Sequence, residues 1–196
     1  MNLVGMQESF NDYPGEICII LFTKSCTFDC TDCHNKYRLL RDPVLSLNSV
    51  ISYLMESKPL ISHVTVSGGE PTLESELVLF LKDLHDRGFG LKLDTNGTNP
   101  DILVSALPYL SVVAMDIKED IQDYSRYLRV CRTLTEDEFS RVQKSAMILS
   151  AWNASGLGKV IFRTTLFDDE IDSDRVKESL SDFSYSDYVV QKKVKL

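Results

Sequence analysis

Three cysteines stand within eight consecutive positions of the chain, at Cys26, Cys30 and Cys33. The spacing C-x3-C-x2-C lets all three side chains of one loop face a common centre, and thiolates are soft ligands that bind iron–sulfur clusters or zinc. Three thiolates leave one iron of a four-iron cluster free for chelation by a small molecule. Two other interpretations fit these residues alone: a structural zinc site completed by His34, and three unrelated core cysteines.

Three further groups of polar residues and glycines each follow an apolar stretch directly, as the cysteine loop follows residues 17–22. In parallel α/β folds the loops at the carboxyl ends of the strands emerge on one side of the sheet, where ligands bind. We therefore expect the cysteines and these groups to form one site. The groups are Ser67-Gly68-Gly69-Glu70-Pro71, Asp94-Thr95-Asn96-Gly97 and Asp116-Ile117-Lys118.

The elements that position this site alternate between strand and helix about six times. Apolar stretches predict strands at 17–22, 61–66, 89–93, 111–115, 160–166 and 188–194. Helical apolar spacing and the capping residues Ser46, Thr135 and Glu138 predict helices at 46–58, 74–87, 101–107, 119–130, 135–152 and 172–183. We place no strand in the polar residues 1–16. The alternation indicates an α/β fold with parallel strands and outer helices, and six units predict a partial (β/α)6 barrel in one domain, residues 1–196.

The composition narrows the classes of function. The chain of 196 residues has a formal net charge of −8, which argues against a nucleic-acid partner. It contains no apolar run that could span a membrane and no N-terminal export signal, so we expect a cytoplasmic location and no membrane partner. Five cysteines without an export signal favour metal binding over disulfides. We expect Cys18 and Cys131 to be inert core cysteines.

Taken together, the motifs quoted above resemble those of the radical S-adenosylmethionine (SAM) superfamily in their order and approximate spacing. Two runs are most similar to the glycyl-radical activating enzymes, and three other features are most similar to the activating protein of anaerobic (class III) ribonucleotide reductase. The first two are Cys33-His34-Asn35 and Leu93-Asp94-Thr95-Asn96-Gly97; the others are Tyr13-Pro14-Gly15, Phe162-Arg163-Thr164-Thr165 and the short chain. The resemblance covers about residues 13–118 and returns at 159–166. It implies the radical SAM type of partial barrel.

The resemblance implies a [4Fe–4S] cluster held by the three cysteines, with SAM chelated at the fourth iron and cleaved reductively to methionine and a 5′-deoxyadenosyl radical. One departure is Asp32, which stands where many members carry an aromatic residue that packs near the adenine. We expect Phe28 or Tyr37 to make that contact instead.

The SAM contacts implied by the resemblance lie on the strand-end groups. Lys118, which we count with the cysteines as catalytic, is expected to bind the SAM carboxylate as a point charge. Arg163 is expected to contact SAM or substrate, or else to be a paired structural arginine. Asp94 and Asp116 are expected to help hold a monovalent cation. The remaining expected SAM contacts are Asn35, Ser67, Gly68, Gly69, Glu70, Asp94 and Thr95.

The function implied first is that of an activase, an oxidoreductase that abstracts a hydrogen atom from a glycine in the glycyl-radical subunit of anaerobic ribonucleotide reductase. The short chain favours a protein substrate, which can bring its own loop to the site. A flavodoxin or ferredoxin is expected as electron donor. Alternatives are activation of another glycyl-radical enzyme (pyruvate formate-lyase type), a small-molecule radical SAM enzyme such as 7-carboxy-7-deazaguanine synthase, and a non-catalytic metal-binding or electron-transfer module.

Overall fold

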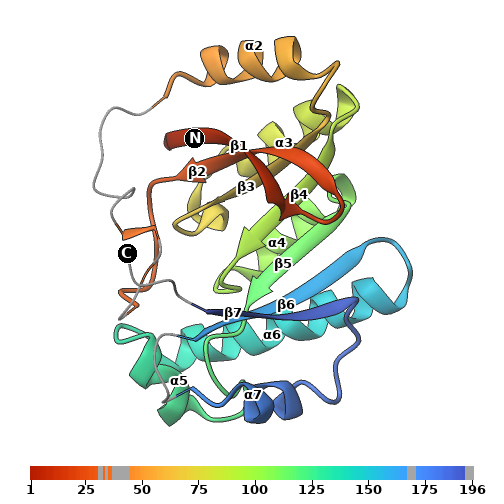
Figure 1. Ribbon diagram of the computed structural model, residues 1–196. Helices are drawn as coiled ribbons and strands as arrows, with labels where there is room; N and C mark the ends of the chain where they lie inside the picture. The colour runs from red at the N-terminus through yellow and green to blue at the C-terminus, as the bar shows by residue number, and fades with distance from the viewer. Residues whose placement is uncertain (31–32, 34, 37–44, 167–170, 193–196) are drawn as a thin grey trace.

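The protein is represented by a computed structural model, which describes residues 1–30, 33, 35–36, 45–166 and 171–192. One seven-stranded sheet runs through the molecule (Figure 1), and its strands lie in chain order. The strands are β1 (Leu3–Tyr13), β2 (Glu16–Thr23), β3 (His63–Gly68), β4 (Gly90–Thr95), β5 (Val112–Asp116), β6 (Lys159–Leu166) and β7 (Asp187–Lys192). The pairings from β2 to β7 are all parallel.

The first strand departs from the prediction for residues 1–16. β1 pairs antiparallel with β2 through a hairpin at Gly15, whose φ of +77° suits glycine. Only Leu3 and Tyr13 of β1 are buried, so the strand covers an edge of the sheet and carries no apolar stretch that could have predicted it.

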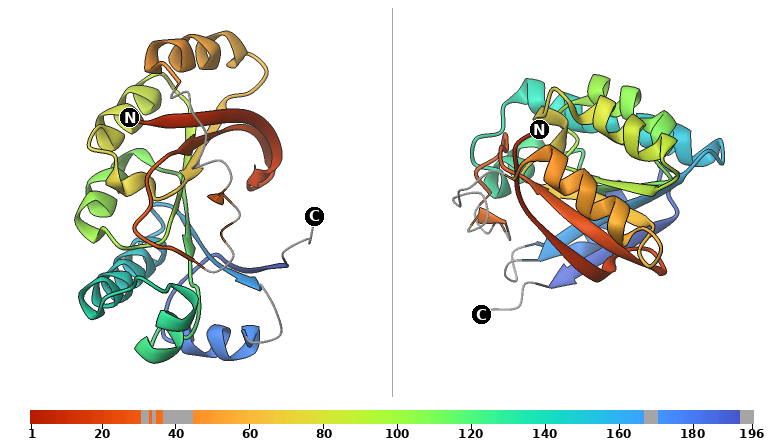
Figure 2. Two further views of the ribbon diagram at one scale, coloured as in Figure 1. Left: turned by 90° about the vertical axis from the view of Figure 1, so that its left-hand side faces the viewer. Right: turned by 90° about the horizontal axis from the view of Figure 1, so that it is seen from above.

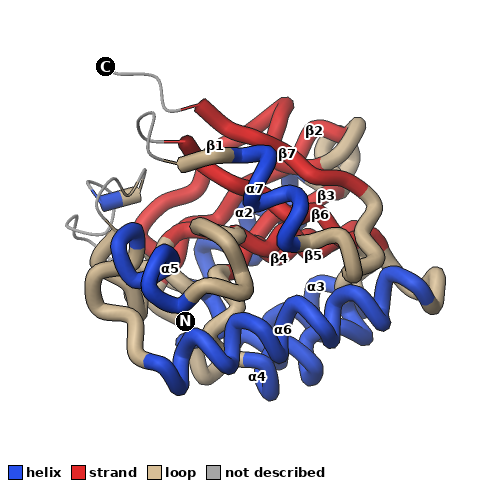
Figure 3. The backbone as a smooth tube through the Cα atoms, turned by 90° about the horizontal axis from the view of Figure 1, so that it is seen from below, coloured by secondary structure: helices blue, strands red, loops and turns tan. Residues whose placement is uncertain are grey.

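The helices lie on the outer side of the curled sheet, with α3, α4 and α6 side by side along it (Figures 2 and 3). Apolar faces of these helices and of the strands form the main core. The helices are α2 (Leu47–Ser57), α3 (Leu77–Asp86), α4 (Pro100–Ala106), α5 (Tyr124–Val130), α6 (Glu136–Ala154) and α7 (Ser173–Ser179), with short 3-10 helices η1 (Pro71–Leu73) and η2 (Leu107–Tyr109).

The predicted helix boundaries agree with the structure at some helix ends and differ at others. Thr135 and Glu138 form the predicted capping box at the start of α6. Ser46 precedes α2 as expected, but its side chain makes no capping hydrogen bond. The predicted start of α3 was too early, because the residues after η1 make a turn and the helix begins only at Leu77. The prediction for α7 was too long, since that helix ends at Ser179.

The curled sheet with its outer helices confirms the partial α/β barrel, with one added antiparallel strand at the β1 edge. Because β2 to β6 are parallel, their carboxyl ends share one side of the molecule. In the part of the chain that the structure describes, no helix has the length and apolarity needed to cross a lipid bilayer.

Candidate active site

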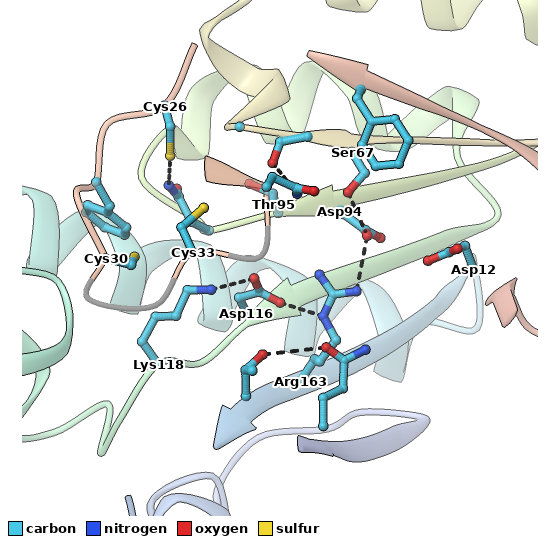
Figure 4. A pocket seen from close by; sticks show the side chains of 18 of the residues that line it. Asp12, Cys26, Cys30, Cys33, Ser67, Asp94, Thr95, Asp116, Lys118 and Arg163 are labelled. Atoms are coloured by element: carbon cyan, nitrogen blue, oxygen red, sulfur yellow. Dashed lines mark hydrogen bonds and ion pairs between the residues drawn. The ribbon is translucent and has the colours of Figure 1, made fainter. Parts of the chain in front are cut away.

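A cavity of about 360 Å³ opens at the carboxyl ends of the strands (Figure 4). Among the described residues, every expected cluster ligand and SAM contact lines this cavity except Glu70, so the four motifs do meet in space. The lining residues are Asp12, Ile20, Phe22, Cys26, Phe28, Cys30, Cys33, Asn35, Ser67, Gly68, Gly69, Asp94, Thr95, Asn96, Asp116, Lys118, Arg163, Thr165 and Gln191.

The three cysteines of the loop after β2 occupy one end of the cavity (Figure 4). Cys30 is buried, and Cys26 and Cys33 are half-buried. Among the described residues, no three side chains of His, Cys, Asp or Glu converge closely enough to hold a single metal ion. His34 and Tyr37, considered above for zinc binding and adenine packing, lie outside the described residues, as does Asp32.

Gly68, which ends β3, and Gly69, which follows it, let the cysteine loop approach the sheet closely. The backbone N–H groups of Gly69 and Glu70 donate to the carbonyls of Thr23 and Ser25, at 3.0 and 2.7 Å. A Cβ on Gly69 would collide with the backbone of Ser25. The loop is held from its far side as well, because Asn35 Nδ2 donates to the carbonyl of Gly68 at 2.7 Å. These contacts place the loop directly over the end of β3.

Charged side chains from β4, β6, the end of β5 and the segment after it form a continuous series of ion pairs at the cavity (Figure 4). The guanidinium of Arg163 bridges two carboxylates, with Nη1 3.1 Å from Asp94 Oδ2 and Nε 2.6 Å from Asp116 Oδ1. Lys118 Nζ donates to Asp116 at 2.6 Å, and Lys92 Nζ donates to Asp94. Three cations therefore meet two carboxylates, which leaves one net positive charge.

These ion pairs set the protonation states of the side chains that form them. Burial alone would raise the pKa of Asp116, but Arg163 and Lys118 hold it well below its ordinary value. The pKa of Asp94 is likewise lowered, against burial, by Arg163 and Lys92. Burial would lower the pKa of Lys118, but Asp116 raises it above its ordinary value. Asp94, Asp116 and Lys118 are therefore charged at neutral pH.

Residues 20–177 match the family model of the radical SAM superfamily. The chain belongs to the radical SAM superfamily. The family's [4Fe–4S] cluster and SAM are therefore its cofactors.

Known proteins related to this radical SAM chain differ in their named activities. One, from Methanocaldococcus jannaschii, is named by inference as a glycyl-radical enzyme activating enzyme; it is 28% identical over 140 residues, which cover 68% of this chain and 56% of that protein. Another is the 7-carboxy-7-deazaguanine synthase of Thermoplasma acidophilum, 28% identical over 86 residues, which cover 44% of this chain and 40% of the relative. The chain thus spans about half the length of the curated relatives it matches.

The crystal structure of Streptococcus suis SuiB bound to S-adenosylmethionine shares the fold of this chain. The TM-score is 0.66 at 14% sequence identity, and the match covers 88% of this chain and 39% of SuiB.

The described residues fit the cofactors of a radical SAM protein. Three thiol side chains face one cavity without forming a mononuclear site, and Lys118, which lines the same cavity, is a cation suited to a carboxylate of SAM. Arg163 lies between Asp94 and Asp116 and pairs with both carboxylates. The monovalent cation expected at these two residues stays a prediction.

Glu70 is turned into the protein instead of the cavity. Its side chain is completely buried and accepts hydrogen bonds from Thr72 N, Thr72 Oγ1, Thr95 Oγ1 and Asn96 N at 3.1, 2.6, 2.8 and 2.6 Å. Burial raises its pKa despite these donors. The hydroxyl of Thr95, expected to contact SAM, donates a hydrogen bond to Glu70. Glu70 therefore ties the ends of β3 and β4 together.

Several residues at the site were missed from the sequence. Lys92 looked like part of an apolar strand, but it lies two positions before Asp94 and hence on the same face of β4, a spacing that could have signalled the pair. Asn96 was quoted only as part of a turn, and its Nδ2 lies 4.0 Å from Cys26 Sγ. Asp12 and Gln191 come from β1 and β7, where no motif pointed to the site.

Cys131 is a buried core cysteine, as expected, yet it also touches the site from behind. Its Sγ lies 3.9 Å from that of Cys30. The hydrogen bond from Cys131 lowers the pKa of Cys30 below its ordinary value, against the effect of burial. Cys18, on β2, lies away from the cavity and bonds Thr65.

Proposed function

We propose that this chain acts, as a single radical SAM domain, as an oxidoreductase that activates a glycyl-radical enzyme. The observation that carries the proposal is one cavity lined at one end by three cysteines and across its middle by the ion pairs that link Asp94, Arg163, Asp116 and Lys118. Such a cavity suits a cluster next to a bound amino acid moiety.

The chain's own residues would divide the work in the following way. Cys26, Cys30 and Cys33 would hold three irons, and Gly68 and Gly69 would present backbone to the ligand. Lys118 would place the SAM carboxylate through the N–H groups not given to Asp116. When bound, the cluster and SAM supply an electron and a primary carbon radical able to remove a hydrogen atom from carbon.

The target we propose is the Cα–H of a glycine in the glycyl-radical subunit of an anaerobic ribonucleotide reductase. The support is the resemblance at Cys33-His34-Asn35 and Phe162-Arg163-Thr164-Thr165, together with the activating enzyme named among the relatives. A flavodoxin or ferredoxin would deliver the electron.

The deciding experiment mixes anaerobically reconstituted, reduced protein with SAM and the cognate reductase, and records an electron paramagnetic resonance (EPR) spectrum. We expect a glycyl doublet on the reductase, lost when its glycine is replaced by alanine. Protein in which Cys30 is replaced by Ala is the matched control and should give neither cluster nor doublet, whereas Cys18→Ala should give both.

A small-molecule radical SAM enzyme is the second candidate, favoured by the similarity to the deazaguanine synthase. It predicts turnover of a free pterin with no radical on any protein partner. That result, with an intact cluster, would reject the activase and keep the radical SAM chemistry.

A further inference from the structure

Cys131 follows α5 and belongs to none of the motifs at the cavity. Its side chain is completely buried, and it does not line the cavity, whereas Cys26, Cys30 and Cys33 all do. It therefore stands behind Cys30, one layer further from the cavity. The separation of 3.9 Å between the two Sγ atoms is far longer than a disulfide bond of about 2.05 Å, so the two thiols are in contact without being bonded.

The contact belongs to a longer junction between two segments about a hundred residues apart in the sequence. Cys30 and Cys131 form an antiparallel bridge pair. Next to it, Thr133 Oγ1 accepts from the N–H of Asp29 at 3.2 Å and lies 3.3 Å from the carbonyl of Thr27, to which it donates. The bridge pair and the two hydrogen bonds of Thr133 thus connect the segment after α5 to the cysteine loop, and they hold Cys131 in place against Cys30.

A thiol in this position can act on a cluster that it does not ligate. When Cys30 is a thiolate ligand it offers lone pairs, and the S–H of Cys131 is a weak donor. Hydrogen bonds to the sulfurs of an iron–sulfur cluster withdraw electron density and stabilise the added electron of the reduced state, so they raise the reduction potential.

We propose that Cys131 is a positioning residue that donates a hydrogen bond to the Cys30 sulfur and raises the reduction potential of the cluster held there. The inference rests on Cys30 as a cluster ligand. It does not depend on the identity of the substrate.

The contact itself is tested in metal-free protein by thiol–disulfide exchange. Oxidised dithiothreitol would be reduced as two protein thiols lose two electrons and two protons, and peptide mapping would identify the disulfide formed. We expect Cys30 linked to Cys131, and no such link in Cys131→Ser. A Cys26–Cys33 disulfide formed while Cys131 stays reduced would contradict the contact.

The effect on the cluster is tested by comparing wild type, Cys131→Ala, Cys131→Ser and the matched buried control Cys18→Ala after anaerobic reconstitution. All four should contain equal iron. At the potential where half the wild-type cluster is reduced by EPR, the reduced-to-oxidised ratio should fall about threefold in Cys131→Ala, as expected for loss of one weak hydrogen bond. Cys131→Ser keeps a donor and should restore the ratio, and Cys18→Ala should leave it unchanged.

Three results would overturn the inference: an unchanged ratio in Cys131→Ala, equal ratios in the Ala and Ser variants, or loss of iron from Cys131→Ala. A failed ligand assignment is recognised separately, because Cys30→Ala would then retain the full cluster.

Discussion

Glu70 and Asp116 are two carboxylates at the same rim of the sheet, and the protein holds them in opposite ways. Glu70 is completely buried and accepts hydrogen bonds from uncharged groups, so burial raises its pKa. Asp116 faces two cationic side chains, which hold its pKa below the ordinary value against the effect of burial. Neutral donors from the backbone and short side chains make Glu70 part of the scaffold. Long cationic partners, which also reach the cavity, make Asp116 part of the cavity lining.

The largest effect that tests this comparison is expected from Glu70→Ala. The change leaves four buried donor groups without an acceptor, and each unsatisfied group costs about 1–3 kcal/mol. We expect the free energy of unfolding of the metal-free protein to fall by about 3 kcal/mol or more, measured by urea denaturation. The exposed Glu56→Ala on α2 is the control and should stay within about 0.5 kcal/mol of wild type. Equal effects of the two changes would refute the scaffold role.

A somewhat smaller loss is expected from Arg163→Ala. Breaking a buried ion pair costs about 3–5 kcal/mol, but the Arg163 side chain is 16% exposed, so we expect about 2–3 kcal/mol in the same measurement. Arg163→Lys should recover only part of it, because one ammonium group cannot reproduce the two-pronged bridge. The surface pair of Arg126 with Asp123 supplies the control, and Arg126→Ala should cost less than about 1 kcal/mol. Wild-type stability in the Arg163→Lys variant would show that the bridge itself is unimportant.

The affinity for SAM should respond differently to changes in the two carboxylate environments. Lys118→Ala should weaken SAM binding by about 1.5–3 kcal/mol, the value of a hydrogen bond to a charged group. Glu70→Gln should leave the affinity within about twofold of wild type, since the Glu70 side chain does not line the cavity. Anaerobic calorimetric titration of the reconstituted variants measures both. If Glu70→Gln weakened binding as much as Lys118→Ala, Glu70 would have to contact the ligand.

The smallest effect is a difference in the sign of the pH dependence. The folded-state pKa of Asp116 is lowered, so its contribution to stability is full above its unfolded value of about 3.9 and is lost as the pH falls below it. The folded-state pKa of Glu70 is raised, so its ionisation opposes folding increasingly as the pH rises above about 4.3. From pH 3 to 7 the cost of Asp116→Asn should therefore grow, and that of Glu70→Gln should shrink. Parallel slopes in urea denaturation would contradict the comparison.

The sequence alone predicted the strands from β2 onward and the meeting of four motifs, because apolar stretches ending in polar turns locate the rim of a parallel sheet. It also named Arg163 and Lys118. It could not tell which way a carboxylate at this rim turns. Glu70 comes just after β3 and Asp116 ends β5, and only the positions of donors on neighbouring elements distinguish their environments.

The remaining misses depend on contacts between distant parts of the chain. β1 carries no apolar stretch and is defined by pairing with β2. The contact of Cys131 with Cys30 joins residues 101 positions apart, a distance over which cysteine spacing carries no information.

The sequential strand order also has a consequence for how the molecule is assembled. Since β1 to β7 lie side by side in chain order, each new strand can add to the edge of those already paired, and none has to insert between two neighbours. A chain synthesised from its N-terminus can therefore build the sheet in the order in which it emerges. The cysteine loop and its glycine support, between β2 and β3, belong to the early part of this growth. Asp94 and Asp116 receive the guanidinium that joins them only when β6 arrives, so the charge balance of the cavity is among the last features to be completed.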